Sequence, residues 1–322
     1  MDPNEQRPVL DITVFILSYN RPRYLREMLS SVLSQTVLPE EIVILDNGSD
    51  NGTKEAVKDL IEGRVRWIGT EYNHQSLWNF KRAFSMSERK YFTILHDDDR
   101  LLPKFLETTV DALEMDNGLI AVTSNGYRID DQGIRTPLKL LPGATEKILY
   151  FQNSEEAALR YSYGYMPFPN MVYRNGFPQR TSIKEEFGKV WDSVFIIDLA
   201  GLGKIAILND PLFEYRHHSG QDSSIFPEDL LQLKEEYILK STEGSNLHSK
   251  ITRNVVHRQS RRFSGLIINS LLKRRDPRHF FDQAGKFAYE HANVPCVMYY
   301  LIFDRMIWHR EKKALSFSED DS

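Results

Sequence analysis

The sequence predicts an α/β fold: a mostly parallel sheet flanked by helices, followed by a helical C-terminal extension. In the first part of the chain, short runs of β-branched and aromatic residues alternate with segments whose apolar residues recur every three or four positions. Strands that alternate with helices in this way form βαβ units, and the strands of such units are parallel. Ligands of these sheets bind beyond the carboxyl ends of the strands, so we expect the functional site at that edge.

Four strands and three helices are expected in this alternating region. Each strand is rich in branched and aromatic residues, and each helix has apolar residues on one face. Pro22 suits the first turn of the first helix, and a turn-rich stretch from Asp46 to Thr53 precedes the second. The expected strands are Asp11–Leu17, Glu41–Leu45, Val65–Ile68 and Tyr91–Leu95, and the expected helices are Pro22–Leu33, Thr53–Ile61 and Ser76–Met86.

An acidic run, Asp97-Asp98-Asp99, follows the fourth strand and precedes a helix that is expected to start at Pro103. Adjacent carboxylates repel one another unless something offsets their charge. A hard cation such as Mg²⁺ or Mn²⁺ offsets it through oxygen ligands, and the same cation binds diphosphates. The alternative is a solvated acidic loop that stabilises the following helix through its macrodipole.

Tyr19 and Asp46 also fall at the carboxyl ends of expected strands, so they should meet the acidic run at one edge of the sheet. An aromatic face, an acceptor for a base N–H and carboxylate metal ligands together suit a nucleotide. No GxGxxG motif follows the first strand and the chain contains no GxxxxGK[ST] motif, so dinucleotide and P-loop sites lose their main support.

Several motifs recur in one order along the chain, and together they resemble the family-2 glycosyltransferases of the GT-A fold. The resemblance extends to about Gly220, and it implies a Rossmann-like sheet. This sequence departs from the family pattern at Asn47, His96 and Gln75. These departures bear on which nucleobase and which donor sugar the protein prefers. The motifs are Ile16–Arg21, Ser34–Thr36, Glu41–Ser49 with Gly52 and Thr53, Asn73, and the acidic run with Pro103.

The resemblance also assigns residues to the donor and to a metal ion. Arg216 follows the last expected strand and would neutralise phosphate charge. Two adjacent histidines are more often surface residues than ligands, but the family's Tyr-Arg-x-His pattern selects His218 over His217. The expected ligands of Mn²⁺ or Mg²⁺ are Asp97, Asp99 and His218. The expected donor-binding residues are Ser18, Tyr19, Asn20, Arg21, Asp46, Asn73, Asn79, Asp97, Asp98 and Arg216.

Asp192 is the expected catalytic base. It stands at the start of an apolar helix, where a carboxylate can act simply as a helix cap. The resemblance instead aligns it with the family's Glu-Asp motif, in which Trp191 replaces the Glu. In an inverting transfer this carboxylate would take the proton of the acceptor hydroxyl as that hydroxyl attacks the anomeric carbon.

Beyond the acidic run, the chain contains further strand signals and two irregular stretches. A hairpin is expected over Asn125–Ile129 and Ile134–Thr136, and a strand pair over Ile205–Leu208 and Leu212–Tyr215. In the resembling family this region meets the acceptor, so residues 137–150 and 164–170 are expected to contact a glycan through aromatic faces. Packing in the core is the alternative for these aromatic side chains.

The composition is that of an ordinary globular protein, with 41% hydrophobic and 11% aromatic residues among 322. Cys296 is the single cysteine, which excludes an intramolecular disulfide and a cysteine-rich zinc module and favours a reducing compartment. The N-terminus lacks signal-peptide features, and the longest apolar run, Val294–Phe303, is shorter than the roughly 20 residues that span a bilayer. A cytoplasmic location is therefore expected.

The predicted division of the chain is a catalytic domain over residues 1–226 and a helical, basic extension over 227–322. Residues 248–313 contain fourteen Lys or Arg against five Asp or Glu, a net charge of +9, whereas the rest of the chain has −13. The extension is expected either to lie on an anionic membrane, at the inner face of the plasma membrane, or to pack on the catalytic domain. Nucleic-acid binding is not expected, because no nucleic-acid-binding motif occurs.

The resemblance implies an inverting, metal-dependent glycosyltransferase that moves a sugar from a nucleotide diphosphate donor, a UDP-sugar. The implied acceptor is a glycan or a lipid-linked glycan, and the implied process is surface polysaccharide biosynthesis. Two alternatives stay open. A nucleotidyltransferase would usually carry a glycine-rich basic loop after the first strand, which this sequence lacks. A protein that binds or senses nucleotide-sugars without catalysis would have no use for Asp192 as a base.

Overall fold

The structure is a computed structural model, and it describes residues 7–141, 145–163, 168, 170–218, 220–221 and 227–259. The chain forms two compact units, Met1–His248 and Ser249–Ser322. Residues 249–259, the described part of the second unit, are helical. The predicted division at residues 226 and 227 stays a prediction, because most of the expected extension lies outside the described residues.

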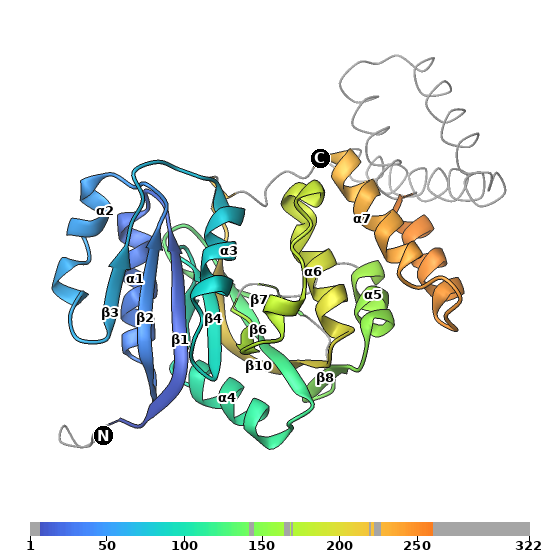
Figure 1. The fold of residues 1–322 in the computed structure, drawn as a ribbon, viewed down its shortest axis with the longest axis horizontal. Helices are drawn as coiled ribbons and strands as arrows, with labels where there is room; N and C mark the ends of the chain where they lie inside the picture. Colours follow the sequence, from blue (N-terminus) through green and yellow to red (C-terminus); the bar gives the residue numbers. More distant parts are fainter. Residues whose placement is uncertain are drawn as a thin grey trace, which may run out of the picture. The chain divides into compact units, whose positions relative to one another are not determined.

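The first half of the sheet is parallel, as predicted. Its strands are β1 (Val9–Ser18), β2 (Leu38–Asp46), β3 (Val65–Ile68) and β4 (Tyr91–His96). They lie side by side in the order β3-β2-β1-β4, and every pairing among them is parallel (Figure 1). Most of their apolar residues are buried, which is typical of a sheet covered on both faces.

The second half of the sheet is mixed. β9 (Val172–Arg174) is antiparallel to both β4 and β6 (Leu119–Ile129), whereas β6 and β10 (Lys204–Arg216) are parallel. The predicted hairpin is confirmed, since β6 pairs with the antiparallel strand β7 (Arg135–Lys139). The sheet is completed by β5 (Arg100–Leu101) and β8 (Ile148–Phe151), which are both antiparallel to β10.

The predicted strand pair between residues 205 and 215 is wrong, because both segments belong to the single strand β10. Its register against β6 shifts on either side of Pro211. Proline has no N–H to donate to the ladder, so the strand continues through it with an irregularity instead of a turn.

Helices flank the sheet and confirm the predicted fold class. Within α1 (Pro22–Leu33), Leu25, Met28, Leu29 and Val32 are buried, the spacing of one helix face. The other helices before the acidic run are α2 (Asn51–Glu55) and α3 (Ser76–Met86), and those after it are α4 (Phe105–Met115), α5 (Ser154–Tyr163), α6 (Trp191–Ala200) and α7 (Glu228–Lys240). Figure 1 shows α5, α6 and α7 grouped beside one another, and these three helices contact each other.

Two predicted helix boundaries differ from the structure. The expected helix Thr53–Ile61 is wrong: α2 ends at Glu55, Val57 leaves helical geometry with φ −124°, and only a 3₁₀ turn, Lys58–Leu60, follows. The helix expected at Pro103 begins instead at Phe105. No helix in the described part of the chain is long and apolar enough to cross a membrane.

Candidate active site

The carboxyl ends of β1, β2 and β4 meet at one edge of the sheet. Ser18, the last residue of β1, pairs with Asp46, the last residue of β2. Leu17 pairs with His96 at the end of β4, and its carbonyl oxygen accepts the N–H of Asp97 at 3.2 Å. The predicted residues at the strand ends are therefore neighbours through backbone pairing.

The turn after β2 depends on a glycine. Gly48 has φ +81°, and a Cβ atom at this position would lie 2.6 Å from the backbone carbon of Tyr72. Only glycine therefore fits this close approach. The turn is also held by the side-chain amide of Asn47, whose Nδ2 donates to Asn73 Oδ1 at 2.9 Å. Asp46 Oδ2 accepts the Ser49 N–H at 3.0 Å, and Asp46 Oδ1 is buried without a hydrogen-bond partner.

The turn after β1 presents an aromatic ring to solvent. The Tyr19 side chain is 43% exposed, and its N–H donates to Asp97 Oδ2 at 3.1 Å. Asn20 adopts a left-handed conformation with φ +49°, and its Oδ1 accepts the Asp50 N–H at 2.8 Å. The buried hydroxyl of Ser18 has no hydrogen-bond partner.

Asn79 lies beneath this edge instead of facing the solvent. It is buried in α3, its Nδ2 donates to the Leu45 carbonyl at 3.1 Å, and its Oδ1 accepts from Arg82 at 2.9 Å. These bonds fix α3 to the end of β2. Its expected contact with the donor stays a prediction.

The side chains of Arg21 and His218 contact the first two residues of the acidic run. Arg21 Nη1 donates to both Asp97 Oδ1 and Asp98 Oδ2 at 3.0 Å, and His218 Nε2 lies 3.0 Å from the same Asp98 oxygen. Burial and then the charge of Asp98 raise the pKa of Asp97 to about 7. Burial also acts to raise the pKa of Asp98. The hydrogen bond with His218, and then the charges of His96 and Arg21, outweigh burial and lower the pKa of Asp98 below its usual range.

Asp99 is different, because one of its oxygens is unused. Asp99 Oδ1 accepts the N–H of Arg216 at 3.0 Å, whereas Oδ2 is buried and has no hydrogen-bond partner. Burial, and then the charge of Asp98, raise the pKa of the Asp99 carboxyl well above its usual range. A buried carboxylate oxygen without a donor is costly unless a ligand or an ion binds it.

The Arg216 side chain is fully buried and is occupied by acceptors of the protein itself. Its Nε donates to the Asp98 carbonyl at 2.7 Å, and its Nη1 donates to the carbonyls of Asp130 and Asp131 at 3.2 and 3.0 Å. Its Nη2 pairs with Glu27. The expected contact between Arg216 and a phosphate stays a prediction, and the guanidinium holds the acidic run against α1 and the β6–β7 turn.

The acidic residues suit a cation that arrives with a diphosphate. No group of three or more His, Cys, Asp or Glu side chains within the described ranges is arranged to hold a metal ion. The expected trio Asp97, Asp99 and His218 therefore stays a prediction. Mg²⁺ sites commonly use one or two carboxylates together with substrate phosphates. The unpartnered Asp99 Oδ2 fits that arrangement.

Asp192 occupies the first turn of α6, where its half-buried carboxylate accepts the Ser193 N–H at 2.7 Å. Burial raises the pKa of Asp192, while the hydrogen bond from Ser193 and the charge of Lys234 act in the opposite direction. Lys234 is buried on α7. A carboxylate with a raised pKa is better suited to accept a proton near neutral pH.

Ring contacts connect the start of α6 to the acidic edge. The Trp191 ring, next to Asp192, lies against Phe80 of α3 with centroids 5.0 Å apart. Phe80 in turn contacts His96, the residue that precedes the acidic run, with ring centroids 5.6 Å apart. Phe168 also contacts both Phe80 and Trp191. One aromatic cluster therefore joins the start of α6 to the end of β4.

The prediction gave Asn170 no role at the acidic edge and named it only as the last residue of an expected acceptor loop. Asn170 is fully buried, has φ +63°, and neither atom of its amide has a hydrogen-bond partner. Nothing in the residue type reveals this, apart from the tolerance of asparagine for left-handed backbone. The other residues expected to meet the acceptor include 142–144, 164–167 and 169, which lie outside the described residues.

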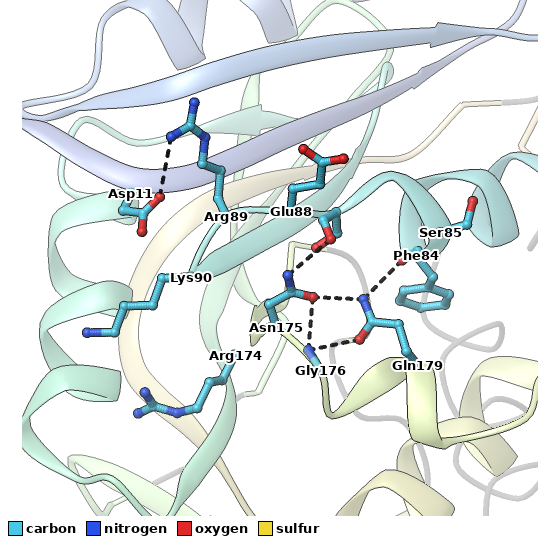
Figure 2. A pocket seen from close by; sticks show the side chains of 11 residues that line it. Asp11, Phe84, Ser85, Glu88, Arg89, Lys90, Arg174, Asn175, Gly176 and Gln179 are labelled. Carbon is cyan, nitrogen blue, oxygen red and sulfur yellow. Dashed lines mark hydrogen bonds and ion pairs between the residues drawn. The ribbon is translucent and has the colours of Figure 1, made fainter.

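A separate groove of about 770 Å³ lies at the opposite end of β4. Figure 2 shows Arg89, Lys90 and Arg174 along it, with the amides of Asn175 and Gln179 turned toward α3. Asn175 donates to the Ser87 carbonyl at 3.0 Å and Gln179 to the Phe84 carbonyl at 2.9 Å. Lys90 directly precedes β4 and Arg174 pairs with Tyr91, the first residue of β4, whereas the acidic run follows the last, so this groove is distinct from the acidic edge.

Comparison with known proteins decides the family. Residues 13–177 match the family model described as Glycosyl transferase family 2, which is about half of the chain. The chain belongs to this family. It is therefore a glycosyltransferase, and the predicted family and GT-A fold are confirmed. The matched range contains the strand ends and the acidic run, but it stops before Asp192.

The relatives agree with this assignment. The chain is 25% identical to an uncharacterized glycosyltransferase of Haemophilus influenzae over 227 residues, which cover 67% of the chain and 68% of the relative. It is 24% identical to glycosyltransferase GlyA of Streptococcus pneumoniae over 67% of the chain, but this match spans only 32% of GlyA. Residues 1–349 of S. aureus TarS, in a crystal structure with UDP-GlcNAc, share the fold with a TM-score of 0.61 and 17% identity. That match covers 86% of this chain and 79% of the TarS chain.

Proposed function

We propose that this protein transfers a sugar from a UDP-sugar to a hydroxyl group of a glycan or a lipid-linked glycan, with inversion at the anomeric carbon. The observation that carries the proposal is the backbone pairing that brings Ser18, Asp46 and the acidic run together, with Asp99 Oδ2 unpartnered among them. The fold shared with TarS, whose structure contains UDP-GlcNAc, supports a UDP-sugar as the donor.

In this proposal the nucleotide binds at the ends of β1 and β2. The exposed ring of Tyr19 stacks on the base, and Asp46 Oδ1, which has no hydrogen-bond partner in the described structure, accepts a base N–H. Asn73 and Asn47 keep the turn around Asp46 in place through their hydrogen bond.

The diphosphate binds beside the acidic run. Asp97 and Asp98 contact the ribose or the phosphates, and Arg21, which already lies at the rim, contacts the diphosphate. Asp99 would hold a divalent cation together with phosphate oxygens. When bound there, Mn²⁺ or Mg²⁺ would supply positive charge for the leaving diphosphate.

Asp192 removes the proton from the acceptor hydroxyl. A new bond forms between the acceptor oxygen and the anomeric carbon, while the bond between this carbon and the diphosphate oxygen breaks. The electron pair of the broken bond leaves with UDP, and the proton stays on the Asp192 carboxylate. Attack from the face opposite the diphosphate inverts the configuration, and no nucleophile of the protein is required.

Release of UDP from a panel of UDP-sugars tests this function. The parent should release UDP in the presence of Mn²⁺ and an acceptor glycan, and Asp99→Asn should abolish the release. Glu114→Gln, which removes an exposed carboxylate on α4, is the matched control and should leave the rate unchanged. Binding of UDP-sugars without any release of UDP would support a sensing protein and contradict a transferase.

We also propose that the basic segment 248–313, most of which lies outside the described residues, contacts an anionic membrane during surface polysaccharide biosynthesis. Its net charge of +9 supports this, because each basic residue near an anionic surface contributes about 1 kcal/mol of attraction. Sedimentation with vesicles of phosphatidylglycerol, but not with vesicles of phosphatidylcholine, is the expected result. Equal sedimentation with both would contradict the proposal.

A further inference from the structure

Asn170 combines two uncommon features at one buried position. Its backbone is left-handed with φ +63°, a conformation that asparagine tolerates better than most residues other than glycine. Its side chain is fully buried, and neither Nδ2 nor Oδ1 has a hydrogen-bond partner. A buried polar group without a partner costs about 1–3 kcal/mol. Features of this kind persist at functional sites, where another state of the protein uses them.

The sheet brings Asn170 to the acidic run. β9 is antiparallel to β4, with Thr93 opposite Val172. Asn170 precedes β9 by two residues, so it lies at the end of β9 that faces the carboxyl end of β4. The adjoining residue is fixed there, because Thr93 Oγ1 donates to the Met171 carbonyl at 3.0 Å.

The neighbour of the Asn170 amide is Asp99. The amide lies close enough to the Asp99 carboxyl to oppose the rise of its pKa. Asp99 Oδ2 is also buried and unpartnered, so an unused donor and an unused acceptor lie beside each other. Hydrogen bonds at catalytic sites are often long in the free protein and become shorter when the ligand binds.

We propose that Asn170 is a positioning residue for Asp99: its Nδ2 donates to the Asp99 carboxylate and orients it toward the divalent cation bound with the donor diphosphate. This inference rests on the proposed function. Groups that orient a metal ligand typically change metal affinity by about 10- to 100-fold when they are removed. Asn170 differs from Asp192 in that it touches neither the acceptor nor the reacting carbon.

The left-handed backbone allows a clean test of the side chain. Asn170→Gly keeps this backbone conformation without strain and removes the amide. If Asn170 has only a structural role in the turn, this variant should bind Mn²⁺ as the parent does. Asn170→Asp keeps the shape of the side chain, but it cannot donate from the same position and it places a second carboxylate beside Asp99.

The experiment measures the affinity of the full chain for Mn²⁺ by electron paramagnetic resonance, with UDP present at saturation. We expect Asn170→Gly to weaken Mn²⁺ binding about 10- to 100-fold and Asn170→Asp to weaken it as well. Asn175→Gly, which removes an amide at the other end of β9, should bind Mn²⁺ like the parent. Circular dichroism of each variant establishes that it is folded.

Three results would overturn the inference. Parent-like Mn²⁺ affinity in Asn170→Gly would reduce Asn170 to a turn residue, and tighter binding in Asn170→Asp would make position 170 a direct ligand. If the parent does not bind Mn²⁺, then Asp99 does not hold this cation and Asn170 cannot orient it. The affinity of the parent for UDP is measured separately in the presence of EDTA. A parent that does not bind UDP would contradict the proposed donor, whereas a change in Mn²⁺ affinity alone would not.

Discussion

The ring of Trp191 lies against that of Phe80, with centroids 5.0 Å apart and an angle of 68° between the planes. This contact joins α6, which begins beside Asp192, to α3, which is fixed to the end of β2 through Asn79. The expected base and the expected nucleotide site therefore share one packed support.

Arg21 should act as the counter-charge of the acidic run when no donor is bound. Arg21→Met leaves Asp97 and Asp98 without the guanidinium that bridges them, so its free energy of unfolding in EDTA should fall by about 1–3 kcal/mol. The loss should be larger when Mn²⁺ and UDP are added, because the variant also lacks the proposed contact with the diphosphate and gains less stability from the ligand. Urea unfolding measures both values. Arg23→Met, at a half-exposed position, is the control, and a loss of equal size under both conditions would contradict this role.

Arg216 should be required for folding. Arg216→Met removes a fully buried cation that four protein groups accept from, and this should cost about 3–5 kcal/mol in urea unfolding. Arg216→Lys should not restore the stability, because an ammonium lacks the planar fork that reaches these acceptors. Exposed Arg128→Met is the control. Normal stability of Arg216→Lys with weak UDP binding would instead support the predicted phosphate contact.

Gly188 should be needed for the packing of α7 near Asp192. It has φ +46°, and a Cβ atom there would lie 2.9 Å from Leu230 Cδ1 of α7. Gly188→Ala should lower the free energy of unfolding by about 1–3 kcal/mol or more, because backbone strain and the collision add. Gly63→Ala is the control, because it introduces the backbone strain without the collision. Gly63 has φ +57°, and nothing lies within 4 Å of a Cβ atom at this position. Equal losses in the two variants, measured by urea unfolding, would argue against the contact with Leu230.

The pH dependence of UDP release should report the Asp192 carboxyl. A general base must be ionised, so the rate should fall as the pH drops through its pKa, and burial raises this pKa above the usual value for Asp. Lys234→Met removes a positive charge that lowers the pKa of Asp192, so the acid limb of kcat/KM should move to higher pH. Lys240→Met, on the exposed face of the same helix, should leave it in place. A limb that does not move would exclude Lys234 as a neighbour of the base.

The sequence was sufficient for the parallel half of the fold. The strands β1 to β4 are short runs of apolar residues that end in polar ones, and the local pattern alone reveals such runs. The sequence was less informative about elements whose bounds depend on contacts between residues distant in the chain. β10 continues through Pro211, and α2 ends early at Glu55, because pairing with β6 and packing of Val57 override local preference.

The same distinction applies to the site. The pattern indicated that Ser18, Asp46 and the acidic run would share an edge, because the ends of parallel strands coincide. It gave no sign that Arg216 would be buried on protein carbonyls, and it placed His218 with Asp97 and Asp99, whereas the His218 ring pairs with Asp98. Those contacts, and the unpartnered amide of Asn170, depend on backbone geometry far from each residue in the sequence.

Transfer by Asp192→Asn compared with the parent tests the central claim most directly. UDP release is measured with a UDP-sugar, Mn²⁺ and an acceptor that the parent uses, and donor affinity is measured in parallel. Asp192→Asn should lower the rate by about 100- to 10,000-fold while donor affinity stays unchanged, because only the base is removed. Glu186→Gln, an exposed carboxylate shortly before α6, should behave like the parent. Parent-like transfer by Asp192→Asn would contradict the account.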